Sequence, residues 1–199
     1  MPPFGENLMI ILSSPSGVGK TTITKKLQQK YQNLKISISH TTRSPRSNEI
    51  DGVDYNFITK KKFEELIKAK KFYEYAKIFE NYYGTLKQRV DEIAKNFDIL
   101  FDIDWQGTKQ LSKFKNLKLI KVFLITDSKE ELKRRLLKRD QNTKEEVEKR
   151  FKSFDDDVKH WKDYDYIIIN KNLETCFKQI EKILHNHKEK HFNFFQRVQ

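Results

Sequence analysis

The sequence predicts an α/β fold built on a parallel sheet, and two features carry this prediction. Short apolar runs that are typical of strands buried on both faces recur along the chain, at Leu8–Ser13, Asp98–Ile103, Leu117–Ile125 and Tyr166–Ile169. Segments with helical character lie between them, and strands that alternate with helices form parallel sheets with right-handed crossovers. The stretch from Tyr55 to Tyr83, rich in aromatic and β-branched residues, instead predicts a small mixed insertion.

The remaining elements follow from spacing and composition. One more strand is expected at Lys35–Ser39, and loop or edge structure at Thr41–Gly52. Two charged helices with few apolar residues are expected to stand out from the core, at Ser128–Arg139 and Lys144–Trp161. Cys176 lies on the apolar stripe of an amphipathic helix and is expected to fill the core. That helix and the others are expected at Lys20–Tyr31, Lys60–Ala69, Leu86–Lys95 and Leu173–Leu184.

Length and composition indicate one domain and leave several partners open. The chain has 199 residues, of which 37% are hydrophobic and 13% aromatic, so wholesale disorder is excluded. The one cysteine excludes an internal disulfide framework and a cysteine-based zinc cluster. The net charge of +12 favours an anionic partner: a nucleic acid, a membrane surface or a phosphorylated small molecule. Because the basic residues form no continuous stripe, no nucleic acid is expected.

The N-terminal apolar run predicts neither targeting nor membrane insertion. Leu8–Leu12 is too short for a signal-peptide core or for a membrane helix, which needs ~20 apolar residues. No basic region precedes it. We therefore expect a cytoplasmic protein that does not bind a membrane.

A phosphate-binding loop is predicted between the first strand and the first helix. Gly19-Lys20-Thr21 opens the helix as in a P-loop, where backbone N–H groups and the helix N-terminus face phosphate oxygens. Lys20 adds positive charge at the transferred phosphate, and the Thr21 hydroxyl can hold Mg²⁺. Ser14 replaces the first glycine of the pattern and would be strained by roughly 1 kcal/mol if its φ were positive. The residues expected to bind ATP here are Ser14, Pro15, Ser16, Gly17, Val18, Gly19, Lys20, Thr21 and Thr22.

Further stretches resemble the guanylate kinases. Ser37–Arg46 is similar to their S-x-S-x-T-T-R-x-P-R pattern, and Glu49–Phe57 is similar to the pattern that follows it, with Asn48 where the family usually has glycine. Three more family-like blocks follow in order, at Tyr73–Ala76, Asn81–Thr85 and Asp102–Gly107. The resemblance implies a single domain over residues 1–199 with three parts. These are a P-loop kinase core (about 1–38, 86–125 and 162–199), an inserted mixed α/β subdomain that binds GMP (about 39–85) and a helical lid (about 126–161).

The resemblance also assigns residues to GMP. Arg43 and Arg46, three apart, can both bind the GMP phosphate, and Tyr55 and Tyr83 are implied as hydroxyl donors to it. Guanine presents an N1–H and an amine as donors and O6 as an acceptor, so its reader needs carboxylates and hydroxyls. The residues implied for GMP are Ser39, Arg43, Arg46, Glu49, Tyr55, Glu74, Tyr83, Thr85, Asp104 and Arg150, of which Glu74 and Asp104 are the carboxylates and Ser39 and Thr85 the hydroxyls for the base.

For ATP and Mg²⁺ the resemblance implies a second set. Asp102 is implied as the acidic partner of Thr21 at the metal, and Asp104, two residues on, is expected on the same side of the strand. Arg135 and Arg139 are the implied lid arginines at ATP, followed by Asp140 where the family usually has a small residue, and Asn170 is implied near the adenine. The residues expected to act in catalysis are Lys20, Arg43, Arg135, Arg139 and Arg150.

The implied activity is Mg²⁺-dependent phosphoryl transfer from ATP to GMP and dGMP, in purine nucleotide metabolism. Three alternatives stay open: a non-catalytic guanylate-kinase-like interaction module, a nucleic-acid-binding protein, and a kinase for another nucleotide. Retention of Gly19, Lys20 and Thr21 argues against the first alternative, whereas Ser14 argues slightly for it. The sequence does not indicate an oligomeric state.

Overall fold

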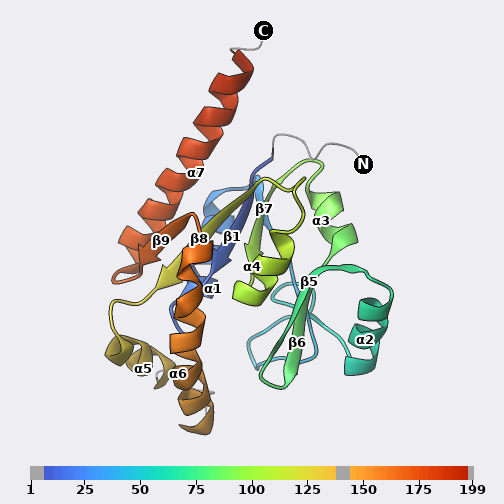
Figure 1. Ribbon diagram of the computed structural model, residues 1–199, viewed down its shortest axis with the longest axis vertical. Helices are drawn as coiled ribbons and strands as arrows, with labels where there is room; N and C mark the ends of the chain where they lie inside the picture. Colours follow the sequence, from blue (N-terminus) through green and yellow to red (C-terminus); the bar gives the residue numbers. More distant parts are fainter. Residues whose placement is uncertain (1–6, 138–143, 197–199) are drawn as a thin grey trace. The chain divides into compact units, whose positions relative to one another are not determined.

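The computed structural model describes residues 7–137 and 144–196, and its main feature is the predicted parallel sheet (Figure 1). This five-stranded sheet has the order β2-β7-β1-β8-β9. Its strands are β1 (Met9–Ser13), β2 (Leu34–Ile36), β7 (Asp98–Asp102), β8 (Leu119–Ile125) and β9 (Tyr166–Ile169). All five residues of β1 are buried, as expected for a strand covered on both faces.

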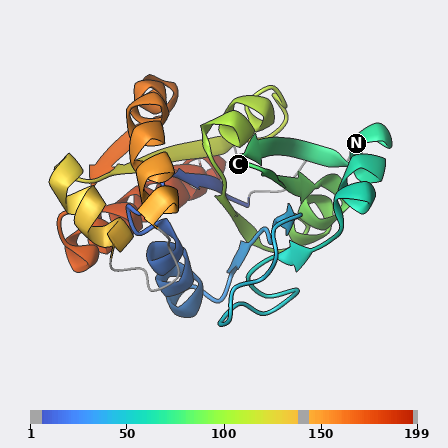
Figure 2. The same ribbon diagram turned by 90° about the horizontal axis from the view of Figure 1, so that it is seen from below.

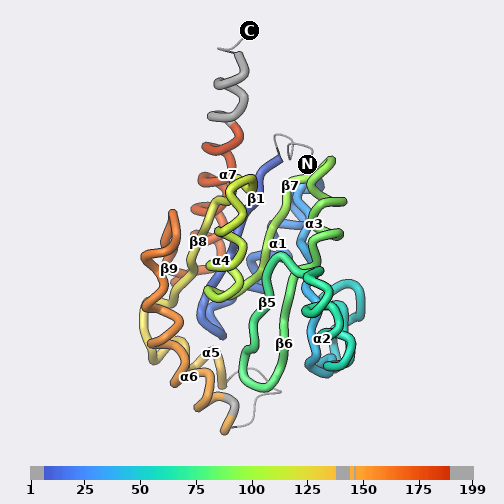
Figure 3. Tube along the Cα trace, turned by 45° about the vertical axis from the view of Figure 1, so that its right-hand side comes forward, coloured from blue at the N-terminus to red at the C-terminus, as the bar shows by residue number. Residues whose placement is uncertain are grey.

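A second sheet of four strands confirms the predicted mixed insertion. Its order is β4-β3-β6-β5, with β5 and β6 forming an antiparallel hairpin (Figure 3). Its strands are β3 (His40–Thr41), β4 (Asn56–Phe57), β5 (Phe72–Ile78) and β6 (Asn81–Leu86). The strand β3 pairs in parallel with β4 and antiparallel with β6.

Seven α-helices are present within the described residues, together with one 3₁₀ helix, η1 (Lys159–Asp163). The α-helices are α1 (Lys20–Lys30), α2 (Lys60–Lys68), α3 (Lys87–Ile93), α4 (Trp105–Leu111), α5 (Lys129–Leu137), α6 (Lys144–Val158) and α7 (Leu173–Gln196). None of the described helices is both long and apolar enough to cross a bilayer.

The chain divides into two compact units. The first consists of the residues up to Ile11 together with Gln32–Leu119, and the second of Leu12–Tyr31 together with the chain from Ile120 onward. The first unit therefore carries the residues implied for guanine, and the second carries the predicted phosphate loop.

In the first unit, α2 is attached to the small sheet through an aromatic stack. The N-cap of the helix is Thr59, whose side chain accepts a hydrogen bond from the Lys62 backbone N–H. Its one fully buried side chain, Phe63, stacks on Phe72 with 4.5 Å between ring centroids and on Tyr82 with 5.3 Å. This stack ties the helix to both strands of the β5–β6 hairpin.

In the second unit, α5 and α6 lie side by side (Figure 2), and their apolar residues correct an expectation. Leu132 and Leu136 of α5 are fully buried, and Val147 and Phe154 of α6 are almost so. The expectation that these charged helices present little apolar face was therefore wrong. Leucines spaced four apart form a narrow stripe that the surrounding charges conceal in the sequence.

The glycines of the predicted phosphate loop have the left-handed backbone that such a loop needs. Gly17 and Gly19 have φ angles of 91° and 104°. In the described part of the chain, the only non-glycine residues with positive φ are Lys70 and Phe79, so Ser14 is not strained. The replacement of the first glycine by serine therefore carries no backbone cost.

Gly17→Ala is expected to lower the free energy of unfolding by about 1–3 kcal/mol. The positive φ strains any side chain there, and a Cβ atom would lie 2.8 Å from Cδ2 of Leu136 and 3.1 Å from Cδ1 of Leu132. Urea unfolding measures the loss. Gly52→Ala is the matched control, because Gly52 has φ of 74° but a Cβ there meets nothing within 4 Å. If both variants lost the same free energy of unfolding, the contact of the added Cβ with Leu132 and Leu136 of α5 would contribute nothing.

Other elements differ from expectation in extent or exposure. The strand expected at Lys35–Ser39 is β2, Leu34–Ile36, and the chain then leaves the sheet after Ser37, whose N–H donates to Leu100 O over 2.9 Å. The last strand is not buried throughout, because Ile167 and Ile169 are 41% and 52% exposed on the edge strand β9. The expected helix Leu173–Leu184 extends to Gln196.

Cys176 confirms its expected place in the core. Its side chain is fully buried, and burial raises the pKa of the thiol to about 11. The thiolate is therefore negligible at neutral pH, which fits a packing role and not a reactive one.

Candidate active site

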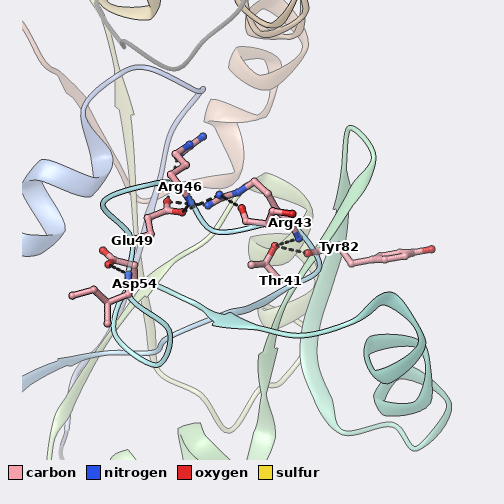
Figure 4. A network of polar contacts seen from close by, with 8 residues as sticks. Thr41, Arg43, Arg46, Glu49, Asp54 and Tyr82 are labelled. Carbon is pink, nitrogen blue, oxygen red and sulfur yellow. Dashed lines mark hydrogen bonds and ion pairs between the residues drawn. The ribbon is translucent and has the colours of Figure 1, made fainter.

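An arginine pair bridged by one carboxylate lies in the loop after β3 (Figure 4). Arg43 donates from its two terminal guanidinium nitrogens, Nη1 and Nη2, to the two Glu49 oxygens, each over 2.9 Å. Arg46 donates to the same carboxylate from its backbone N–H over 2.8 Å and from its guanidinium over 3.4 Å. The structure thus brings together three residues predicted for GMP. It also shows how they are ordered: Glu49 holds both guanidinium groups in one place.

The loop that carries this cluster is pinned to β6. Thr41 donates its hydroxyl proton to Tyr82 O over 2.9 Å and accepts a hydrogen bond from Arg43 N over 3.2 Å. The Tyr82 N–H in turn donates to the Thr42 hydroxyl over 2.9 Å. Since both threonines of the Thr-Thr-Arg stretch bond to Tyr82, they set the direction in which the chain leaves β3.

The aromatic rings predicted near the phosphate lie against Arg43. Its guanidinium sits 5.3 Å from the centroid of the Tyr55 ring, and Tyr55 and Tyr83 pack edge to face at 5.9 Å. Burial first, and the neighbouring charge of Asp102 second, raise the pKa of Tyr55 well above its usual value. Tyr55 therefore keeps its proton at neutral pH and can donate a hydrogen bond.

Opposing effects set the charge of Glu49. Burial acts to raise its pKa, but the hydrogen bonds from Arg43 and from the Arg46 backbone outweigh burial and hold the pKa below its usual value. The Glu49 side chain is only 11% exposed. A carboxylate so enclosed stays ionised because two cations face it.

Glu49→Gln is expected to lower the free energy of unfolding at pH 7 by about 1–2 kcal/mol, because it removes charge-assisted hydrogen bonds. The folded-state pKa of Glu49 is depressed, so this contribution is complete above the unfolded pKa and is lost as pH falls through the folded value. Urea unfolding of both proteins should therefore show a gap at pH 7 that closes below about pH 4. A pH-independent gap would contradict this account, and the exposed Glu64→Gln is the control.

A carboxylate and a hydroxyl face each other across the β5–β6 hairpin. Glu74 and Thr85 are direct cross-strand partners, and they are 3% and 0% exposed. The Thr85 hydroxyl oxygen makes no hydrogen bond with any residue that the structure describes. Ser39, also predicted for the base, is 8% exposed and lies next to β3, where His40 pairs with Gly84 of β6. Two predicted base-reading residues thus lie on neighbouring strands, and the third directly precedes a strand of the same sheet.

Asp104 belongs to a different element from the one expected. The strand β7 ends at Asp102, and Asp104 is the N-cap of α4, where its Oδ1 accepts the Gly107 N–H over 2.9 Å. Because Asp104 lies beyond the end of the strand, strand alternation alone does not fix the direction of its side chain, and its expected place on the same side as Asp102 stays a prediction. A Cβ atom on Gly107 would lie 2.5 Å from Glu74 Oε2, so both carboxylates adjoin this one glycine.

In the second unit, the phosphate loop is tied to residues predicted for ATP. Val18 O accepts hydrogen bonds from Arg135 over 3.0 Å and from the Asn170 amide over 2.7 Å. Arg135 also donates to Asn170 O over 2.9 Å. Two residues earlier in the loop, Arg150 donates to the Ser16 hydroxyl over 2.7 Å. The helices α5 and α6 therefore each place one arginine on the loop.

The positive charge of α5 is partly balanced within the helix. Glu131 accepts hydrogen bonds from Arg134 over 2.7 Å and from Arg135 Nε over 2.6 Å, and these bonds lower the pKa of Glu131 to about 2. Arg135 is thereby oriented by an ionised carboxylate four residues earlier. The predicted Arg139, and Asp140 after it, lie outside the described residues.

Lys20 and Thr21 occupy the first turn of α1, directly after the left-handed Gly19. That placement gives both side chains access to a phosphate at the helix N-terminus. Asp102, the predicted second ligand for the metal, belongs to the other unit. Among the described residues, no group of three or more His, Cys, Asp or Glu side chains is arranged to hold a metal ion.

Comparisons with known proteins show to which family the chain belongs. A family model described as "Guanylate kinase" matches residues 6–187. The chain belongs to the guanylate kinase family. It is 45% identical to a guanylate kinase of Paramagnetospirillum magneticum over 89% of this chain and 83% of that protein. It is 43% identical to a guanylate kinase of Rickettsia felis over 94% of this chain and 97% of that protein.

Solved structures agree with the family. The crystal structure of a guanylate kinase from Anaplasma phagocytophilum superimposes with a TM-score of 0.76 at 31% identity, covering 92% of this chain and 86% of that one. An SH3-kinase fragment of tight junction protein 3 shares the fold at 13% identity, with a TM-score of 0.52. As a member of the guanylate kinase family, the chain is a nucleoside monophosphate kinase.

Proposed function

We propose that this guanylate kinase transfers the γ-phosphoryl group of ATP to GMP and dGMP, giving ADP and GDP or dGDP. One observation carries the choice of acceptor base: the buried Glu74 carboxylate lies directly across the hairpin from the buried Thr85 hydroxyl. A carboxylate accepts hydrogen bonds from the guanine N1–H and amine, and a hydroxyl donates to O6. Adenine has its donor and acceptor exchanged on this edge, so it would leave buried groups unpaired, at a cost of about 1–3 kcal/mol each.

The acceptor phosphate binds at the Arg43–Glu49–Arg46 cluster in this proposal. Both guanidinium groups are held in one place by Glu49, and Tyr55 and Tyr83 lie against Arg43 with the Tyr55 hydroxyl protonated. Such a cluster supplies charge-assisted donors that suit a phosphate dianion. The anionic GMP phosphate oxygen then needs no general base to attack the donor phosphorus.

The donor binds at the loop Ser14–Thr22. The left-handed Gly17 and Gly19 let backbone N–H groups face phosphate oxygens, and Lys20 adds a charge at the γ-phosphate. Arg135 and Arg150, already bonded to the loop, stabilise charge on the moving group, and Asn170 lies at the adenine. Thr21 and Asp102 have the oxygen donors that Mg²⁺ prefers and would hold it, and bound Mg²⁺ would neutralise phosphate charge. In this proposal Arg139 joins the other lid arginines.

The same proposal assigns parts of the chain. Residues 39–85 form the GMP-binding insertion, residues 126–161 the lid, and the remainder the core of a single domain. The enzyme acts on small molecules in the cytoplasm, without nucleic acid or membrane partners. A non-catalytic interaction module is the alternative, and it loses its one supporting feature because Ser14 is unstrained.

An acceptor panel tests the proposal. ADP release from Mg²⁺-ATP is measured with GMP, dGMP, AMP, UMP and IMP in turn, each over a range of concentrations. We expect GMP and dGMP to be phosphorylated with the highest kcat/KM, and AMP and UMP at least ~100-fold less well. Turnover with AMP or UMP equal to that with GMP would overturn the choice of base. No turnover with any acceptor, together with GMP binding, would support the interaction module.

A further inference from the structure

One face of α4 is built against the edge strand β5, on which Glu74 lies. The helix and the strand run side by side (Figures 1 and 3). The residues Asp104, Gly107 and Gln110 follow at intervals of three, so they share this face. Asp104 is the cap of α4, and the other two residues have no role in the proposed chemistry.

Gln110 acts as a strand partner for β5. Its Nε2 donates to Tyr75 O over 2.6 Å, and its Oε1 accepts the Tyr75 N–H over 3.2 Å. One amide side chain therefore satisfies both backbone groups of one residue on the outer strand of the small sheet. Tyr75 directly follows Glu74, so the two hydrogen bonds hold the backbone that carries the buried carboxylate.

Gly107 lets the helix approach that carboxylate. A Cβ atom at this position would lie 2.5 Å from Glu74 Oε2 and 3.0 Å from Glu74 Cδ. Gly107 does not have a positive φ, so its value here is the space it leaves and not its backbone freedom. Its N–H donates to Asp104 Oδ1 over 2.9 Å, so the same residue contacts the second carboxylate.

We propose that Gly107 and Gln110 are positioning residues that set the spacing of Glu74 and Asp104, and thereby the selectivity for an amine-bearing purine edge. This inference rests on the proposed function, since it assumes that the two carboxylates read the base. Gln110 fixes the strand that carries one carboxylate, and Gly107 keeps the other close to it. Neither residue contacts the nucleotide; both act through the carboxylates.

The two positions allow stability and selectivity to be separated. Gly107→Ala places an alanine inside a helix, which favours the helical state, but it displaces the end of the Glu74 side chain. Gln110→Met keeps the length of the side chain and removes both hydrogen bonds to Tyr75. A role in folding alone predicts that neither variant changes the choice of nucleotide.

The test compares GMP with IMP, which lacks the exocyclic amine. For each variant we measure Kd for both nucleotides by calorimetry, kcat/KM for both by ADP release, and the melting temperature. We expect the GMP-over-IMP ratio of kcat/KM to fall by about tenfold in both variants, with KM for ATP unchanged. The melting temperature of each variant reports its effect on folding separately from this ratio. Lys109→Ala, exposed on the same helix, and Gln88→Met, on the exposed face of α3, are controls that should keep the wild-type ratio.

The outcomes separate the inference from the proposed function. A wild-type protein that phosphorylates GMP, with both variants keeping the GMP-over-IMP ratio within about twofold, overturns the inference alone. A Gln110→Met protein that melts earlier with an unchanged ratio also overturns it, because the hydrogen bonds would then serve stability only. A wild-type protein that neither binds nor phosphorylates GMP overturns the proposed function, and the inference with it.

Discussion

Lys20→Ala is expected to lower the turnover number at least ~100-fold, by analogy with the removal of one donor that stabilises charge in the transition state. Lys20 stands in the first turn of α1, after the loop with two left-handed glycines that is proposed to bind phosphate. Lys20 is the one charged residue of Ser14–Thr22, and it is the first residue of the helix. Steady-state ADP release with saturating ATP and GMP measures the loss.

Lys25→Ala is the matched control for this variant. Lys25 lies on the same helix, five residues after Lys20, with an exposed side chain, so its removal changes net charge equally. Near-normal turnover of Lys20→Ala would remove Lys20 from the chemistry. An equal loss in both variants would attribute the effect to net charge and not to position.

Arg43→Met is expected to raise KM for GMP by roughly 10–100-fold, since hydrogen bonds to charged groups contribute about 1.5–3 kcal/mol. Arg43 makes both of its paired hydrogen bonds to Glu49, and its guanidinium lies over the Tyr55 ring. Methionine keeps much of the apolar stem and removes the charge. KM for ATP should not change, because the proposed function places Arg43 at the GMP phosphate and not at ATP.

The comparison variant is Arg89→Met, which removes an arginine that is 58% exposed on α3. Its KM for GMP should equal that of the wild type. If Arg43→Met raised KM for ATP as strongly as KM for GMP, Arg43 would not be specific to the acceptor. Urea unfolding of Arg43→Met separates loss of binding from loss of folding, because Glu49 is left without its main partner.

The sequence predicts most accurately the strands that are buried on both faces, because burial alone determines their apolar pattern. Buried parallel strands are apolar throughout, so β1, β7 and β8 stand out in the sequence. The helix α4 was missed, because Trp105–Leu111 has a central glycine and few apolar residues, and the contact that stabilises it is with β5. The partial exposure of the edge strand β9 is not evident from the sequence, because three successive isoleucines look alike whether or not a neighbouring layer covers them.

For the candidate site, the sequence indicates individual residues but not the contacts between them. Family-like motifs name Glu49, Glu74 and Thr85 one at a time, but they do not show that Glu49 bridges two arginines or that Glu74 faces Thr85. Those relations depend on the register of β5 with β6 and on the fold of a loop, and neither is encoded in residue spacing. Gln110 had no motif to mark it, since its partner is the backbone of a residue distant in sequence.

Calorimetric titration with GMP and, in parallel, with AMP tests the central claim most directly, because it measures recognition of the base without any chemistry. The account predicts a saturable heat with GMP and at least ~100-fold weaker binding of AMP. Glu74→Gln should reduce this preference, as the carboxylate that accepts from the guanine edge is lost. Absence of heat on titration with GMP, or equal affinity for GMP and AMP, would contradict the account.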